Sequence, residues 1–324
     1  MIMSSNLADD LKGWIPYKTY EEAGELYCKW LFVGNKTFTE PFFDETIAKC
    51  KSLPQNSTLK QCISHSILLT EWSPSIETIA PSAIIFHVSR CKSTLLSQLL
   101  GIDAENIILA EVPILDEILR WGFNNKIEDK ILLYLQSAIS FYGAKRISTQ
   151  QRLFIKTDSW HIHFYHQYRK LYPTIPFIFL YRNPEEVIRS HQKLRGMHAV
   201  PGLIEPAIFG IDHSAINYND LDDYMTIVLE TYFTSIYEIV QNDSLAILIN
   251  YNEGMMNIVE KTAQLTQMKV TNDLREEMEK RLLYHSKNIQ QKYAEEANVL
   301  QPNSAGIKRC YTQYEQLEKM RLCK

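Results

Sequence analysis

The chain has 324 residues, of which 45% are hydrophobic and 22% are charged. These fractions are typical of a globular protein, and they exclude a disordered chain, a collagen and a coiled-coil rod. The formal net charge at pH 7 is −4, so the sequence predicts no general affinity for nucleic acid or for an acidic membrane surface.

The cysteines and the N-terminal segment bear on the cellular compartment. The six cysteines are scattered without a CxxC pair, and a chain of this size can bury its core without disulfides. The segment MIMSSNLADDLKGW has neither the basic nor the apolar region of a signal peptide. No apolar run approaches the roughly 18 residues that a membrane span needs. We therefore expect a cytoplasmic protein.

Residues 1–80 are predicted to form a mainly helical N-terminal extension. The pattern over residues 8–51 predicts two or three helices with aromatic pieces between them. Pro54, Pro74 and Pro81 interrupt the mixed polar stretch that follows. Because proline breaks regular elements, we place a domain boundary between residues 80 and 81.

Residues 81–324 are predicted to form an α/β domain. Short apolar runs rich in branched and aromatic residues are typical of strands buried on both faces, and they occur at 83–88, 107–109, 153–155, 177–181 and 245–249. Helical patterns separate them, at 94–101, 113–122, 128–143, 160–171, 184–193 and 220–241. This alternation predicts a three-layer α/β/α fold with a central parallel sheet. Ligands of such sheets bind where the strands end.

The first strand of this domain leads directly into a polar loop and a helix. The loop reads Ser89-Arg90-Cys91-Lys92-Ser93-Thr94. The N–H groups and the dipole at a helix start favour a phosphate or sulfate there. Alternatively, Ser93 or Thr94 only caps the helix. The Walker pattern of nucleotide-binding P-loops matches only at Lys92 and Ser93, because Phe86 and Cys91 stand where its glycines belong.

The strand at 177–181 leads into Arg182, and Ser190 follows eight residues later. An arginine at a strand end can hold a phosphate through two hydrogen bonds, with a hydroxyl completing the shell. The alternative interpretation is that Arg182 pairs with Glu185 or Glu186 and that Ser190 is simply exposed. Two other strand ends carry carboxylates, Glu111 and Asp158. Either could act as a general base, or serve only as an acid at a helix start.

Two segments together resemble the sulfotransferase family, whose members use 3′-phosphoadenosine 5′-phosphosulfate (PAPS) as donor. They are IIFHVSRCKSTLLSQLL at 84–100 and FIFLYRNPEEVIRSH at 177–191. The first family signature, a basic loop entering a helix, falls on residues 90–94. The second, an arginine followed eight residues later by a serine, falls on Arg182 and Ser190. The resemblance implies a P-loop fold, a 5′-phosphosulfate held by residues 89–94 and a 3′-phosphate held by Arg182 and Ser190.

Further positions extend the resemblance to the catalytic residues. In the protein-tyrosine branch of the family, a catalytic glutamate follows the last loop threonine by seventeen residues, and Glu111 stands at that position. In the cytosolic branch, a Lys-Thr-His segment supplies a catalytic histidine, and Asp158 stands in its place after Lys156 and Thr157. The resemblance implies that Arg90 stabilises charge on the donor, with Glu111 as first and Asp158 as second choice for the base. The late segment containing Ser286 and Lys287 is similar to the basic loop that closes over the nucleotide in bacterial members.

One residue departs from the family pattern. Lys92 stands where the family usually has glycine. Glycine permits backbone angles that bring the loop close to the donor, whereas lysine loses that freedom and adds a charge. Two alternatives therefore stay open: an ATP-dependent P-loop kinase that uses Lys92 and magnesium, and a non-catalytic family member that binds a nucleotide.

The expected activity is transfer of a sulfuryl group from PAPS to a hydroxyl or amine. The acceptor is expected to be a small molecule or a peptide, and residues 1–80 are expected to help cover its site. The scheme requires no metal. Neither nucleic acid nor a membrane is expected as a partner, and a homodimer is the expected assembly if the chain associates.

Overall fold

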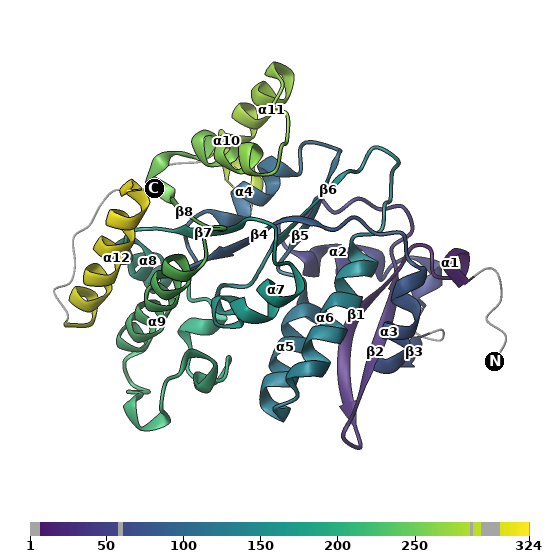
Figure 1. Ribbon diagram of the computed structural model, residues 1–324, viewed down its shortest axis with the longest axis horizontal. Coiled ribbons are helices and arrows are strands. Elements are labelled where there is room, and N and C mark those ends of the chain that lie inside the picture. Colours follow the sequence, from purple (N-terminus) through teal and green to yellow (C-terminus); the bar gives the residue numbers. More distant parts are fainter. Residues whose placement is uncertain (1–6, 58–60, 286–287, 293–304, 324) are drawn as a thin grey trace. The chain divides into compact units, whose positions relative to one another are not determined.

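Five short strands form the central parallel sheet of an α/β fold (Figure 1). The computed structural model describes residues 7–57, 61–285, 288–292 and 305–323. The strands are β4 (Pro81–His87), β5 (Asn106–Ala110), β6 (Arg152–Lys156), β7 (Phe177–Tyr181) and β8 (Ala246–Asn250), in the order β5-β6-β4-β7-β8. Every residue of β5 and β7 is buried, as expected for strands covered on both faces. The predicted α/β class and all five predicted strands are confirmed.

Helices flank the sheet and confirm most of the predicted helical segments. They are α4 (Ser93–Leu100), α5 (Pro113–Asn125), α6 (Glu128–Tyr142), α7 (Tyr165–Leu171), α8 (Pro184–Lys193), α9 (Leu221–Asn242), α10 (Met255–Leu265), α11 (Asn272–Leu282) and α12 (Ala305–Cys323). Both α5 and α8 begin with proline. Proline fits this position because the N–H group that it lacks would have no acceptor within the helix. The segment predicted as one helix over 160–171 instead begins as the 3₁₀ helix η4 (Ser159–Phe164).

Residues 1–80 are not mainly helical, and that part of the prediction is wrong. Three strands, β1 (Trp14–Glu22), β2 (Glu25–Phe32) and β3 (Cys62–His65), form an antiparallel sheet in sequence order. The helices of this segment are short: α1 (Leu7–Asp10), α2 (Phe43–Cys50) and α3 (Ser66–Trp72). A further pair of short antiparallel strands, β9 (Tyr284–His285) and β10 (Asn288–Lys292), lies late in the chain.

The turn between β1 and β2 shows why this segment forms strands and not helices. Its central residues Ala23 and Gly24 have φ of 53° and 80°, the pair of positive angles that a tight hairpin turn requires. In β2, Leu26, Cys28 and Trp30 are buried in alternation, and this period of two is that of a strand. The apolar residues of the segment therefore satisfy a hairpin and not a helix.

The chain divides into two compact units. The first comprises residues up to Ala83 together with Ser97–Thr157 and Gln167–Pro173. The second comprises Ile84–Leu96, Asp158–His166 and the residues from Thr174 onward. The domain boundary predicted between residues 80 and 81 stays a prediction. Among the helices that the structure describes, none has the length and apolar character needed to cross a membrane.

A buried carboxylate stabilises the first unit. The Glu40 side chain is only 3% exposed, and it accepts hydrogen bonds from Lys36 Nζ at 2.7 Å, Lys49 Nζ at 3.0 Å and Thr46 Oγ1 at 2.6 Å. Burial alone would raise the pKa of Glu40, but these hydrogen bonds lower it from 4.5 to about 2. The folded state therefore favours the ionised carboxylate.

Replacing Glu40 by Gln is expected to lower the free energy of unfolding by about 1 kcal/mol at pH 7, because both lysines are partly exposed. The folded pKa lies below the unfolded one, so the stabilisation is present above pH 4.5 and is lost as the pH falls toward 2. Urea unfolding at several pH values should show that the difference in free energy of unfolding between wild type and Glu40→Gln shrinks as the pH falls over that range. Glu45→Gln, at an exposed position of α2, is the control. A gap that widens on acidification would contradict this assignment.

Candidate functional site

The loop between β4 and α4, residues 88–92, has an unusual backbone. Three of its residues, Ser89, Arg90 and Lys92, have φ of 67°, 53° and 58°. In this left-handed region a residue with a Cβ is less stable by about 1–2 kcal/mol. Such strain persists only where surrounding contacts hold it, and it is concentrated at ligand-binding sites. The β4–α4 loop is therefore the first candidate for a binding site.

Contacts within the second unit hold the β4–α4 loop in place. The Ser89 N–H donates to Nδ1 of the buried His87 at 3.1 Å. The thiol of Cys91 is buried and donates to the Leu180 carbonyl of β7 at 3.5 Å. The Lys92 carbonyl accepts the N–H of Leu95 at 3.0 Å and so begins α4. Ser93 and Thr94 are buried in the first turn of that helix.

Lys92 stands where the sulfotransferase pattern has glycine, and its backbone has a left-handed φ of 58°. Its ammonium lies 5.0 Å from the centroid of the Tyr251 ring, a cation–π contact. Tyr251 begins the 3₁₀ turn η8 (Tyr251–Glu253) directly after β8. The loop thus combines a left-handed backbone at Lys92 with the positive charge of its side chain.

Arg182 connects the end of β7 to the β4–α4 loop. Its Nη1 donates to the carbonyl of Arg90 at 3.1 Å, and its guanidinium carbon lies 4.5 Å from the Tyr251 ring centroid. Its Nε donates to Oε2 of Glu186 at 2.6 Å, so the ion pair that we weighed as an alternative is present. Ser190 lies half-buried on α8. The structure therefore brings the two signature segments together through Arg182.

Three cations gather around this loop. The guanidinium of Arg90 donates to the carbonyl of Leu194, just beyond α8. Arg182 and Lys92 share the ring of Tyr251. In the part of the chain that the structure describes, Glu186 is the carboxylate paired with Arg182. A concentration of positive charge beside a helix start suits a ligand with more than one anionic group.

Glu111 belongs to the first unit and pairs with a buried lysine. It follows β5 directly and has φ of 55°. Its N–H donates to the Lys156 carbonyl at 2.9 Å, and its carboxylate accepts from Lys156 Nζ. Lys156 is 1% exposed and Glu111 23% exposed at the side chain. The ammonium also lies 5.6 Å from the Phe42 ring centroid. These contacts fix the carboxylate while leaving it reachable by solvent.

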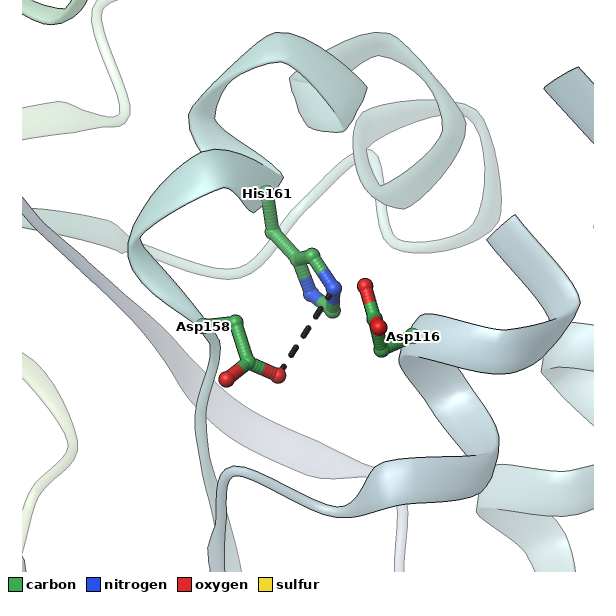
Figure 2. Close-up of side chains that lie close together, drawn as sticks. All are labelled: Asp116, Asp158 and His161. Atoms are coloured by element: carbon green, nitrogen blue, oxygen red, sulfur yellow. Dashed lines mark ion pairs between the residues drawn. The ribbon is translucent and has the colours of Figure 1, made fainter. Parts of the chain in front are cut away.

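Asp158 belongs to the second unit, at the start of η4. Figure 2 shows its carboxylate directed toward the imidazole of His161, with Oδ2 at 3.8 Å from Nε2. The side chain of His161 is 2% exposed and that of Asp158 is 14% exposed. The two candidate bases thus differ in partner: a lysine holds Glu111, and a histidine faces Asp158.

One contributor to the site was not predicted, and two predicted residues cannot be placed. Tyr251 contacts both Lys92 and Arg182, yet no motif marks it. The signal that could have found it is its position directly after the fifth strand. Ser286 and Lys287 lie outside the described residues.

Comparisons with known proteins find a distant likeness among solved structures. No family model matches the chain, and no curated protein matches it. Among solved structures, a sulfotransferase from Alicyclobacillus acidocaldarius is similar in fold, with a TM-score of 0.40 and 13% sequence identity. The match covers 75% of this chain and 96% of that one.

Replacing Lys92 by Gly should give a more stable protein than replacing it by Ala. Both substitutions remove the cation–π contact with Tyr251, but only glycine relieves the left-handed backbone at φ 58°. The expected difference is about 1 kcal/mol, or roughly 2 °C in Tm for a chain of this size. Calorimetry of the two variants measures it.

Gln136 supplies the matched control. It is exposed in the interior of α6, where glycine is less stable than alanine by about 1 kcal/mol. The order of stability should therefore be reversed at that position. If alanine were the more stable substitution at both positions, the strain assigned to Lys92 would be wrong.

Proposed function

We propose that this chain is a sulfotransferase that uses PAPS as donor. It transfers the sulfuryl group to a hydroxyl or amine of a small molecule or peptide. The observation that carries the proposal is the contact of Arg182 with the Arg90 carbonyl and with Tyr251. Through it, the segment expected to hold the 3′-phosphate adjoins the loop expected to hold the 5′-phosphosulfate.

The donor's two anionic ends match the two parts of this site. The β4–α4 loop and the first turn of α4 bind the 5′-phosphosulfate, with Arg90, Ser93 and Thr94 as side-chain partners. Arg182 and Ser190 bind the 3′-phosphate. Nε of Arg182 is paired with the Glu186 carboxylate at 2.6 Å, so the phosphate binds at the Nη groups of the guanidinium. A second phosphate binding site of this kind has no use on ATP, which lacks a 3′-phosphate.

The transfer itself follows from charge and position. The acceptor oxygen or nitrogen attacks sulfur, and the bond from sulfur to the bridging oxygen of the donor breaks. The electron pair of that bond passes to the 5′-phosphate, where Arg90 and Lys92 stabilise the added negative charge. A carboxylate removes the acceptor proton. Glu111 is proposed for this role and Asp158 is the second choice. The scheme calls for no metal because the arginine and lysine side chains supply the positive charge.

The donor site can be tested with the desulfated donor, 3′-phosphoadenosine 5′-phosphate. At 100 times its dissociation constant, it should stabilise the wild type by about 2.7 kcal/mol, a shift of several degrees in thermal unfolding. Arg182→Ala should lose this shift. Arg275→Ala should keep it, because Arg275 is an ion-paired surface arginine of α11.

The comparison ligand is magnesium-ATP. A shift with magnesium-ATP alone would replace the proposal with the kinase alternative. A bisphosphate shift without turnover of PAPS on phenols, amines and tyrosyl peptides would favour the non-catalytic alternative. No shift with either nucleotide would exclude the proposed donor site.

The base can be identified by two isosteric substitutions. Glu111→Gln should lower sulfuryl transfer by roughly 10²–10⁴-fold while leaving bisphosphate binding unchanged, since only proton removal is affected. Asp158→Asn should retain most of the turnover. Transfer of labelled sulfate from PAPS to the best acceptor of that panel measures both. The opposite pattern would assign the base to Asp158.

A further inference from the structure

The C-terminal helix α12 contacts the ends of two neighbouring strands. Glu318 of α12 accepts a hydrogen bond from the Tyr181 hydroxyl and another from Asn250 Nδ2, the latter at 2.8 Å. Tyr181 and Asn250 are the last residues of β7 and β8, and they are paired directly across the parallel ladder. One carboxylate therefore joins the ends of both strands. In Figure 1, α12 (yellow) lies near β8 and α8, in agreement with its contacts.

The residues that follow these two strand ends belong to the proposed donor site. Arg182 comes directly after Tyr181, and Tyr251 comes directly after Asn250. The guanidinium of Arg182 and the ring of Tyr251 stack at 4.5 Å. A shift of one strand end against the other would change this stacking distance directly. Glu318 therefore binds the residue before Arg182 and the residue before Tyr251.

The Glu318 carboxylate is held firmly by its own partners. Arg321 donates to it from Nε at 3.1 Å and from Nη2 at 2.8 Å. Burial would raise the pKa of Glu318, but hydrogen bonds from Arg321, Tyr181 and Asn250 lower it below its usual value. The carboxylate is therefore charged at neutral pH. Charged acceptors make the stronger hydrogen bonds.

Two further contacts of α12 reach the same segments. Arg321 Nη1 lies 3.3 Å from Oε1 of Glu253, and that oxygen accepts the Asn250 N–H at 2.9 Å. On the other side of Arg182, the Tyr311 hydroxyl lies 3.1 Å from Oδ1 of Asn183. Contacts from α12 therefore hold the residues on both sides of Arg182 as well as the turn that carries Tyr251.

We propose that Glu318 is a positioning residue that sets the geometry of Arg182 and Tyr251, and with it the affinity for the 3′-phosphate of the donor. The proposal rests on the proposed function, because the ligand it concerns is the PAPS-type nucleotide. Glu318 does not touch the ligand in this scheme. It acts by holding the ends of β7 and β8 at one separation.

Binding of two nucleotides separates this role from a general loss of structure. Glu318→Gln removes the charge and should raise the Kd for 3′-phosphoadenosine 5′-phosphate by about 10- to 100-fold, the loss typical of a charged hydrogen bond. The Kd for adenosine 5′-phosphate, which lacks the 3′-phosphate, should change less than about threefold. Glu315→Gln is the matched control, because Glu315 is an exposed glutamate of the same helix. Isothermal titration calorimetry measures all the values.

A double-mutant cycle shows whether the effect passes through Arg182. In an Arg182→Ala background, Glu318→Gln should cause no further loss of bisphosphate affinity, since the residue that it positions is gone. Additive losses would overturn the proposal. If Glu318→Gln fails to fold, Tyr181→Phe replaces it. This variant removes the hydroxyl that Glu318 accepts from and leaves the Arg321 ion pair intact.

Amide hydrogen exchange tests the positioning without any ligand. Residues 182–186 and 251–254 should exchange faster in Glu318→Gln than in Glu315→Gln. If the wild type does not bind the bisphosphate, the proposed function is wrong, and with it the part of this proposal that concerns the ligand; faster exchange would then leave only the positioning of Arg182 and Tyr251 standing. If both variants exchange alike and bind the bisphosphate alike, the positioning role of Glu318 is overturned.

Discussion

The hydrogen bond from Arg182 to the carbonyl of Arg90 is the contact on which the candidate site depends. It joins the end of β7 to a loop that holds three residues at positive φ. A loop with this strained backbone keeps its conformation only where surrounding contacts hold it. Arg182 holds it through a hydrogen bond from a charged donor to a backbone carbonyl, which is stronger than a bond between neutral groups. The side chain of Arg182 is 22% exposed, so it can still reach a ligand.

The three cations near the β4–α4 loop repel one another, and the structure contains features that offset this repulsion. The ring of Tyr251 accepts both Lys92 and Arg182 on its π-electrons, and Glu186 neutralises part of the charge on Arg182. The single negative charge of Glu186 does not cancel three positive charges. An anion that enters such a site finds its partners already oriented, so less of the binding free energy is lost in ordering them.

The sequence predicts the second half of the fold better than the first. Uninterrupted apolar runs identified all five strands of the parallel sheet, because a strand buried on both faces has no polar alternation to obscure it. The hairpin of β1 and β2 was missed because its turn signal is only Ala23-Gly24. For the candidate site, local motifs pointed to residues 89–94 and to Arg182. Tyr251 and Glu318 were not predicted, since their roles arise from partners about 70 residues or more away in the chain.

The position of β8 gives a physical reason for the involvement of α12. Among the strands that the structure describes, β8 stands at one end of the sheet order, and β7 is its only neighbour there. The end of an edge strand is constrained from one side alone, yet here it must carry Tyr251 at a defined distance from Arg182. A second constraint has to come from outside the sheet. The hydrogen bond from Asn250 to Glu318 is such a constraint. Because the Tyr181 hydroxyl donates to the same carboxylate, one helix aligns both strand ends, and the site does not depend on the stiffness of the edge strand.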